Sequence, residues 1–492
     1  MGCLGHSSAS VTPSLIAEAF RRVCRDRRGA MAVCSLPEGR VTSFDDLLEG
    51  FSALGLALRR AGVDRGATVV SLVGNRPSFF SLFAACMDLG AALVALGDAT
   101  DAEAAALVRQ TGASVVVTDR QPFLSSRHRT TLNDGTSILA LGDPPRIRQY
   151  GESVVLKLTS GSTDLPKAAV AAEIHLVNDG RHIIEAMGIG ANDINFTCIP
   201  LSHSYAIGNV VMPLIWQGTS TALRQSFNPT QFVQDVTTSR ASVFPGVPFM
   251  FDRLRSSAQI DRLPDGLRLL ITAGARADPE TVVWFRNVLD RKVHSFYGTS
   301  ETGGIAYDDS DEVADPLHVG HAVPETTITV ERREPDTVVG RILVRGNAIA
   351  YGYADPAATD AASTFNGGFL TGDLGRVDDN GRLVLTGRAS ALVNVAGRKV
   401  DPSEVERALL ALPGIADARV LGMPCDVRGQ EVVAFVIRRD TSLTTLAIRR
   451  RCATALSPYK IPRRVVFLDR FPLDPRGKID RRALEELATE RW

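Results

Sequence analysis

The sequence predicts an α/β protein with a largely parallel sheet, followed by a smaller α+β module. Residues 40–120 alternate helical patterns, such as FDDLLEGFSALGLALRRAG, with short β-branched runs, such as ATVVSLVG and ASVVVTD. This alternation is typical of βαβ units, and it continues from 154 to about 300. From 338 to 387 short β runs alternate with glycine turns, which favours antiparallel strands. With 492 residues, 45% of them hydrophobic, the chain can build about two or three domains.

The individual elements follow in order along the chain. The apolar run FFSLFAACMDLGAALVALG is broken by Asp88 and Gly90, so we expect a buried helix and then a buried strand rather than a membrane span. Further strands are expected at VVLKL, SVFPGV, LRLLITAG and KVHSFYG, and antiparallel ones at GRILVRG and GRVDDNGRLVLTG. The small module follows Gly387. Its clearest helix opens at Asp401-Pro402-Ser403-Glu404, a capping arrangement that contributes about 1 kcal/mol.

Charge and cysteine usage exclude several function classes. Lys+Arg and Asp+Glu both number 55, so net charge supports neither a nucleic-acid nor a membrane-surface partner. The seven cysteines show no ligand spacing, which favours reduced thiols in a cytoplasmic protein without structural zinc. The first residues, MGCLGHSS, carry no recognised targeting pattern.

The segment TSGSTDLPK, residues 159–167, is the first candidate site. It is not a Walker A loop, because Gly161 is followed by Pro166-Lys167-Ala168 where that motif needs Gly-Lys-Ser/Thr. Backbone N–H groups, hydroxyls and one cation after a strand can still bind phosphate. The alternative is an ordinary turn. No G-x-S-x-G elbow and no G-x-G-x-x-G after a strand is present, so neither a hydrolase nor a dinucleotide enzyme is supported.

Six motifs, read in order, resemble those of the adenylate-forming enzymes. They are TSGSTDLPK, PLSHSYAIG, YGTSETGG, TGD, GRASALVNVAGRKVDPSEVE and PRGKIDR, and the family includes acyl- and aryl-CoA synthetases, firefly luciferase and nonribosomal-peptide adenylation domains. The resemblance covers nearly the whole chain. It implies a large N-terminal domain, 1–388, of two α/β subdomains plus a distorted β-barrel, and a small mobile α+β C-terminal domain, 389–492.

The resemblance also implies a reaction. Family members join a carboxylic acid to ATP, forming an acyl-adenylate and pyrophosphate, and most then pass the acyl group to a thiol of CoA or of phosphopantetheine on a separate acyl carrier protein. The first step brings an anion to an anion, and each like-charge pair costs roughly 4 kcal/mol at about 4 Å and an effective dielectric of about 20. Cations are therefore expected at the site.

By resemblance, Glu301 would hold Mg²⁺, and Lys478 would neutralise the attacking carboxylate and the charge developing on the α-phosphate. Ser300 would reach the α-phosphate, Tyr297 would stack on adenine, and Asp373 and Arg388 would bind the ribose. Thr159, Ser160, Gly161, Ser162, Thr163 and Lys167 would grip the β- and γ-phosphates, and the remaining nucleotide-site residues would be Gly274, Ala275 and Gly298.

The acid-binding residues implied by the resemblance are His203, Ser204, Tyr205, Gly208, Gly274 and Gly303, with His203 also assigned to catalysis. Simpler alternatives stay open for the key residues: core packing for Tyr297 and His203, turn or surface acids for Asp373 and Glu301, and a solvated tail lysine for Lys478. Gly397 matches a glycine past which the thiol arm approaches.

The chain departs from the family pattern at Asp164 and Ala168, where glycine is usual, and at Ser390, where a hinge Asp or Lys is usual. We expect Asp164 to occupy the bend and to face solvent or a cation, because its charge would repel phosphate. We expect Ser390 to serve as the hinge.

The acid is expected to be a simple acyl or aryl acid, because PLSHSYAIGN offers no carboxylate to pair with an amino-acid ammonium. Three hypotheses remain: an ATP-dependent acid–thiol ligase, an adenylating enzyme with a non-thiol acceptor, and a degenerate nucleotide-binding member.

Overall fold

The structure is a computed structural model. It describes residues 13–97, 99–121, 124–141, 150, 152–159, 167–257, 260–311, 313, 318–332, 337–355, 367–389, 393–395, 398–400, 402–425, 429–456, 458–473 and 479–490. The chain divides into two compact units, of which the first comprises Met1–Ile328 and Val344–Phe369 and the second Thr329–Leu343 and Leu370–Trp492. The domain boundary expected between 388 and 389 stays a prediction.

The first unit contains a run of strands in the order β2-β1-β11-β10-β12-β13-β14-β15-β16. From β1 to β14 neighbouring strands are parallel, and β2, β15 and β16 are added antiparallel at the two ends of this run. The bounds are β1 Met31–Ser35, β2 Arg40–Ser43, β10 Ile194–Thr197, β11 Ser220–Leu223, β12 Val243–Gly246, β13 Leu269–Thr272, β14 Val293–Thr299, β15 Gly303–Tyr307 and β16 His318–Ala322.

A second sheet in the same unit has the order β6-β7-β5-β3-β4-β8-β9. Its central strands β5, β3, β4 and β8 are parallel, whereas β9 folds back antiparallel on β8. The bounds are β3 Thr68–Leu72, β4 Ala92–Ala95, β5 Val115–Thr118, β6 His128–Thr131, β7 Ser137–Ala140, β8 Val154–Thr159 and β9 Lys167–Ala172.

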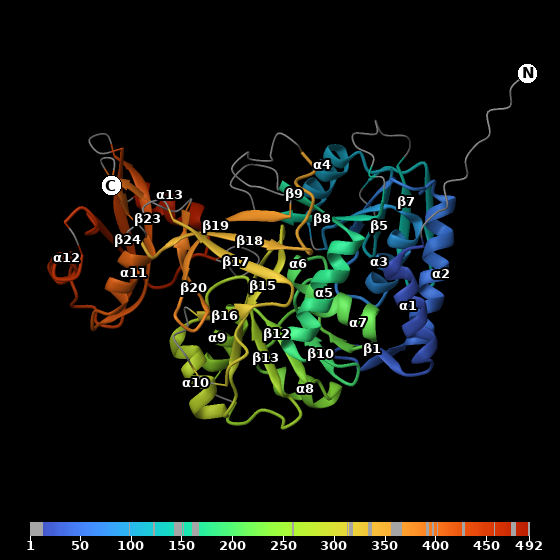
Figure 1. The fold of residues 1–492 in the computed structure, drawn as a ribbon, viewed down its shortest axis with the longest axis horizontal. Helices are drawn as coiled ribbons and strands as arrows, with labels where there is room; N and C mark the ends of the chain where they lie inside the picture. The colour runs from blue at the N-terminus through green and yellow to red at the C-terminus, as the bar shows by residue number, and fades with distance from the viewer. Residues whose placement is uncertain are drawn as a thin grey trace, which may run out of the picture. The chain divides into compact units, whose positions relative to one another are not determined.

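Helices cover these sheets and share a core with them (Figure 1). Apolar side chains from α1, α2, α3, α5 and α7 join the faces of both sheets in one buried cluster, which includes Phe20, Phe83, Val69, Val155, Phe196 and Ile271. The bounds are α1 Leu15–Asp26, α2 Phe44–Arg60, α3 Ser78–Leu89, α4 Asp101–Thr111, α5 Glu173–Met187, α6 Ser204–Ala206, the π-helix η1 Ile207–Val211, α7 Met212–Gln217, α8 Phe232–Ser239, α9 Pro248–Ser256 and α10 Pro279–Leu289.

The second unit has a mixed sheet in the order β22-β21-β24-β23, with β25 parallel to β24. Alternate residues of β24 point to two separate cores: Val432, Ala434 and Val436 to one, Val433 and Phe435 to the other. Both faces are therefore covered. The bounds are β20 Leu383–Arg388, β21 Val393–Val395, β22 Arg398–Val400, α11 Pro402–Leu410, β23 Ile415–Cys425, β24 Gly429–Arg438, α12 Thr445–Cys452, β25 Arg464–Leu468 and α13 Arg481–Glu490, while β17 Thr326–Glu331, β18 Gly340–Gly346 and β19 Gly368–Val377 contribute to both units.

The predicted α/β class with a smaller α+β module is confirmed. The run expected to be a helix followed by a strand forms α3 and β4, separated by Gly90 in the left-handed conformation. The helix expected near residue 401 begins at Pro402, and β19 and β20 are antiparallel. The described strands form open sheets and no closed barrel. Within the same residues, every helix lacks the length or the apolarity that crossing a bilayer requires.

Candidate active site

Most predicted site residues of the first unit lie at the carboxyl ends of parallel strands. The 200–208 segment follows β10, Gly274 and Ala275 follow β13, and 297–301 form the end of β14 and the turn after it. These three strands belong to one sheet and run in the same direction, so the three segments emerge at one edge. Ligands of open α/β sheets bind at this edge.

The hairpin of β8 and β9 frames the predicted phosphate loop. Thr159, the last residue of β8, pairs with Lys167, the first of β9. Ala168 pairs with Leu158 as an ordinary strand residue, so its β-carbon is accommodated at this departure from the family pattern. The predicted loop residues Ser160, Gly161, Ser162 and Thr163, together with Asp164, lie outside the described residues.

Tyr353 connects Lys167 with Glu301. Its hydroxyl donates a hydrogen bond of 2.7 Å to Oε1 of Glu301, and Nζ of Lys167 lies 5.2 Å from the centre of its ring. Burial, and then the charge of Glu301, raise the pKa of Tyr353 above its ordinary value, so the phenol keeps its proton and donates. Sequence motifs predict Lys167 and Glu301 as site residues, but they do not predict Tyr353.

Backbone hydrogen bonds hold the 350–354 segment in place. On one side, the N–H of Tyr351 donates to the carbonyl of Val170 at 3.0 Å, and the N–H of Val170 donates to the carbonyl of Gly352 at 2.8 Å. On the other side, the N–H of Ala350 donates to the carbonyl of Glu301 at 2.8 Å. The segment thus bonds both β9 and the turn that carries Glu301. No motif in the YGY stretch reveals this, because its partners are distant in sequence.

Two residues expected to act on different parts of the substrates are in contact. The hydroxyls of Ser204 and Ser300 lie 2.7 Å apart. His203 is exposed, and its Nδ1 accepts a hydrogen bond of 3.3 Å from the N–H of Tyr205. Tyr205 points into the core, where its hydroxyl donates to the carbonyl of Ile271 at 3.4 Å. The structure therefore groups Ser204 with Ser300 but buries Tyr205.

The predicted glycines occupy two kinds of environment. Gly274 has a φ of +84°, and an added β-carbon there would meet nothing within 4 Å. At Gly208 and Gly303, a β-carbon would collide with α5, at Ile183 and at the carboxylate of Asp179 respectively. Close packing and a φ of +70° are therefore a sufficient reason for Gly303. At Gly208 the clash is with the end of the Ile183 side chain, and the contact of both glycines with the acid stays a prediction.

Tyr297 and Gly298 lie side by side at the end of β14. Tyr297 is buried and Gly298 is exposed. A β-carbon at Gly298 would lie 2.5 Å from the carbonyl oxygen of Gly303, so the approach of β15 requires glycine here. The stacking of Tyr297 on adenine stays a prediction.

The second unit brings together the two residues expected at the ribose. Asp373 on β19 pairs in register with Arg388 on β20, and Nε of Arg388 lies 2.8 Å from Oδ1 of Asp373. The carboxylate is largely buried, whereas the guanidinium is exposed. Lys478, Ser390 and Gly397 lie outside the described residues.

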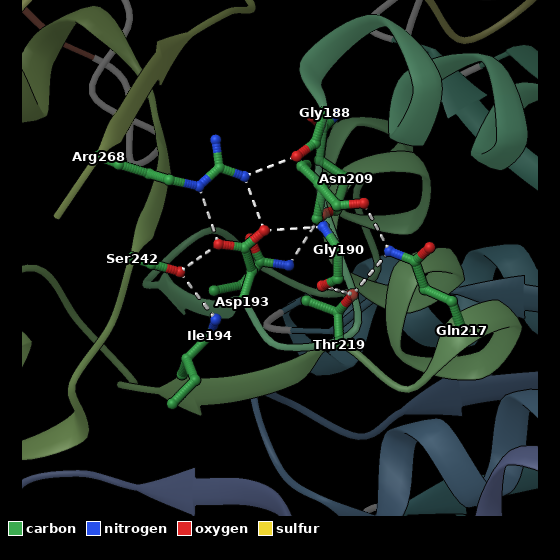
Figure 2. A network of polar contacts seen from close by, with 11 residues as sticks. Gly188, Gly190, Asp193, Ile194, Asn209, Gln217, Thr219, Ser242 and Arg268 are labelled. Carbon is green, nitrogen blue, oxygen red and sulfur yellow. Dashed lines mark hydrogen bonds and ion pairs between the residues drawn. The ribbon is translucent and has the colours of Figure 1, made fainter. Parts of the chain in front are cut away.

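A polar network occupies the opposite edge of the parallel strands (Figure 2). Asp193 accepts hydrogen bonds from Arg268 at 2.7 and 3.0 Å, from Ser242 at 2.7 Å and from the N–H of Gly190 at 2.7 Å. Asp193, Ser242 and Arg268 directly precede β10, β12 and β13. The network therefore joins the amino ends of three strands whose carboxyl ends carry candidate site residues.

The part of the chain that the structure describes contains no cluster of three or more His, Cys, Asp or Glu side chains suited to a metal. A single carboxylate such as Glu301 still fits Mg²⁺, since this ion usually takes one or two carboxylates together with substrate phosphates. The donor set suits a metal that arrives with a nucleotide.

Comparison with known proteins identifies the family of this fold. Residues 20–354 match the family model described as AMP-binding enzyme, and residues 404–478 match that of the AMP-binding enzyme C-terminal domain. The chain is 26% identical to 4-coumarate–CoA ligase 5 of Oryza sativa subsp. japonica, over 94% of this chain and 93% of the relative.

Two solved structures have a similar fold. ATP-bound MatB from Rhodopseudomonas palustris gives a TM-score of 0.80 at 22% identity, over 96% of this chain and 99% of that one. The amide bond synthetase McbA from Marinactinospora thermotolerans gives a TM-score of 0.78 at 24% identity, over 96% and 99%.

Proposed function

The chain belongs to the AMP-binding enzyme family, and from this premise we propose that it couples a carboxylic acid to AMP at the expense of ATP. The products of this first step are an acyl-adenylate and pyrophosphate. The acyl group then passes to the thiol of CoA. The protein is thus an AMP-forming acid–thiol ligase.

One observation supports this function more than any other. Lys167 and Glu301, which come from distant motifs, both contact Tyr353. A cation and a carboxylate that share one neighbour, beside a hairpin whose loop is rich in hydroxyls, suit a magnesium-bound triphosphate. A turn lysine and a surface acid with no common role would not need this arrangement.

In the proposed reaction Lys167 and the 159–163 loop bind the β- and γ-phosphates, and Ser300 contacts the α-phosphate. Asp373 accepts hydrogen bonds from the ribose hydroxyls, with Arg388 beside it. Lys478 supplies positive charge where the carboxylate attacks, because charge that develops in the transition state is stabilised by a preorganised cation.

Glu301 would bind Mg²⁺ together with the phosphate oxygens of ATP. When bound, the ion neutralises phosphate charge and polarises the bonds to phosphorus. Glu301 itself has the simpler task of presenting one carboxylate oxygen, while Tyr353 occupies the other.

We propose an aryl or acyl acid as the substrate. The 203–209 segment carries no carboxylate that could pair with an ammonium group, and its polar groups include the hydroxyl of Ser204, which contacts that of Ser300. A phosphopantetheine thiol on a separate carrier protein is the proposed alternative to CoA.

A second candidate keeps the adenylation step and replaces the thiol by an amine or hydroxyl acceptor. The fold shared with a protein named as an amide bond synthetase is the observation that favours it. Product analysis with and without CoA distinguishes the two: a thioester that forms only with CoA supports the ligase, and an amide or ester formed without it supports the second candidate.

The first prediction concerns Lys478. We expect wild-type protein to release pyrophosphate with at least one acid of an acyl and aryl panel, and Lys478→Ala to lower that rate by about 10²–10³-fold through lost transition-state stabilisation. ATP binding should change far less. Equal pyrophosphate rates for wild type and variant would remove the role assigned to this lysine.

A further inference from the structure

We propose that Tyr353 is a positioning residue that sets Glu301 and Lys167 in the arrangement required by magnesium-bound ATP. This inference rests on the proposed function, and it concerns a residue that no adenylate-forming motif identified above contains. It concerns two separate contacts of one side chain, the hydroxyl with Glu301 and the ring with Lys167.

The hydroxyl of Tyr353 fixes one of the two oxygens of Glu301. It donates to Oε1 at 2.7 Å, which leaves Oε2 to face a metal ion. A carboxylate on a turn can otherwise rotate about its side-chain bonds, and ordering it on binding costs conformational entropy. A hydrogen bond already made before ATP arrives removes part of that cost.

The ring of Tyr353 provides a surface for Lys167. Nζ lies 5.2 Å from the ring centre, within the range of a cation–π contact. The lysine begins β9, directly after the predicted phosphate loop. The ring therefore favours one position of this ammonium group, beside Tyr353.

The backbone around Tyr353 makes this arrangement rigid. Its neighbours Gly352 and Ala354 bond β9 through Val170 at 2.8 Å and Ala168 at 2.7 Å, and Ala350 bonds the carbonyl of Glu301 at 2.8 Å. Tyr353 itself is only 9% exposed. The side chain thus projects from a segment already bound to both elements that it connects.

Tyr351 provides a matched control on the same segment. Its hydroxyl also donates to a glutamate, Oε1 of Glu152, at 3.0 Å. Tyr351 is 57% exposed. Tyr351→Phe therefore removes a tyrosine–glutamate hydrogen bond two residues away without touching Glu301 or Lys167.

The test measures ATP binding by calorimetry on the full chain, without any acid, in excess Mg²⁺ and again in EDTA. Tyr353→Phe keeps the ring and loses the hydroxyl, so we expect about a tenfold weaker binding of Mg-ATP and little change in EDTA. Tyr353→Leu loses both contacts and should weaken binding in both conditions. Tyr351→Phe should match wild type. Thermal unfolding verifies that each variant is folded.

Binding of Mg-ATP by Tyr353→Phe within twofold of wild type would overturn the inference. An equal loss of ATP affinity with and without Mg²⁺ would also overturn it, because a merely structural role weakens binding in both conditions. If wild type binds Mg-ATP but adenylates no acid, while Tyr353→Phe shows the magnesium-dependent loss, then the proposed function fails and the positioning role stands. If wild type binds no Mg-ATP, both fail.

Discussion

Lys157 and Asp179 form an ion pair inside the first unit. The Nζ of Lys157, on β8, lies 3.6 Å from Oδ2 of Asp179, on α5, and the two side chains are 2% and 3% exposed. Oδ1 of Asp179 accepts a hydrogen bond of 2.8 Å from the N–H of Gly304. A charge buried this deeply is costly unless it is paired. The pair therefore joins β8, which leads to the phosphate loop, to β15, which follows Glu301.

Removing one member of this pair should be far more harmful than removing both charges. We expect Lys157→Met to lower the free energy of unfolding by about 3–5 kcal/mol, because it leaves Asp179 charged and buried. Lys157→Met combined with Asp179→Asn should recover most of that loss, since asparagine can still accept from Gly304. Urea denaturation of both variants measures this, and equal destabilisation of the single and double variants would contradict it.

Sequence motifs predicted the residues that are expected to contact the substrates, but not those that position another residue. Lys167, Glu301, Asp373 and Arg388 could be named from the sequence, and the structure pairs the last two. Tyr353 could not, because its partners come from other segments. Asp179 was missed for the same reason, because its partners Lys157 and Gly304 lie on β8 and β15.

Among the elements, the parallel strands carry the candidate site at one end and a stabilising polar network at the other. The carboxyl ends of β10, β13 and β14 carry the candidate site, whereas the network around Asp193 lies at the amino ends of β10, β12 and β13. Burial by itself raises the pKa of the Asp193 carboxyl, but hydrogen bonds from Arg268, Gly190 and Ser242 outweigh burial and hold the pKa below its ordinary value. The charged form therefore stabilises the fold.

Asp193→Asn should destabilise the protein without weakening ATP binding. Because the folded pKa is lowered, the stabilisation is complete above the ordinary pKa of about 3.9 and is lost as pH falls through the folded value. We expect the free energy of unfolding to fall by about 1–3 kcal/mol at pH 7. Below about pH 4 the variant should differ less from wild type. Urea titrations at several pH values measure it.

Asp265→Asn is the matched control for this experiment. Asp265 also accepts two hydrogen bonds from an arginine, Arg262, both at 2.9 Å, but both side chains are exposed. Solvent screens such a pair, so this variant should unfold like wild type at every pH. The network would have another role if Asp193→Asn lowered the free energy of unfolding no more than Asp265→Asn does. A matching fall in ATP affinity would lead to the same conclusion.

Elements with a strong hydrophobic pattern were predicted from the sequence. An element that forms because it pairs with a neighbouring strand was not. The helix and strand of α3 and β4 were expected from one apolar run with a glycine break. β9 was not, because KAAVAA contains a single β-branched residue and alanine has little strand preference. Pairing with β8 along its whole length makes it a strand.

The whole molecule is described as two units with separate cores. The first unit holds Cys24, Cys86 and Cys198, all buried, and burial raises the pKa of each thiol to about 12. The second holds Cys452, whose pKa burial also raises. Because the thiolate is the reactive form, each cysteine reports the opening of its own unit.

Pulse alkylation along a urea gradient should reveal two transitions. In a Cys3→Ser background we expect Cys425, which is partly exposed, to react first. Cys452 should become reactive at lower urea than Cys86 and Cys198, since a smaller unit buries a smaller fraction of its surface. Mass spectrometry of the labelled peptides measures the order. One transition common to all the buried thiols would show that the units unfold together.

At this scale the sequence predicted the fold class and the family, because six motifs in order carry more information than any one of them. The α/β class and the smaller α+β module are both found. The implied barrel is not closed among the described strands. The closure of a sheet into a barrel depends on strand tilt and shear, and short sequence patterns specify neither of them.

The pairing of Thr159 with Lys167 has a consequence for how this protein can evolve. Because two bonded strands fix where the stretch 160–166 begins and ends, exchanging one residue type for another leaves both anchors in place. Inserting or deleting a residue instead changes the loop length, which is one of the features that fix the register of a hairpin. Divergent homologues should therefore differ far more in the amino-acid sequence of this stretch than in its length.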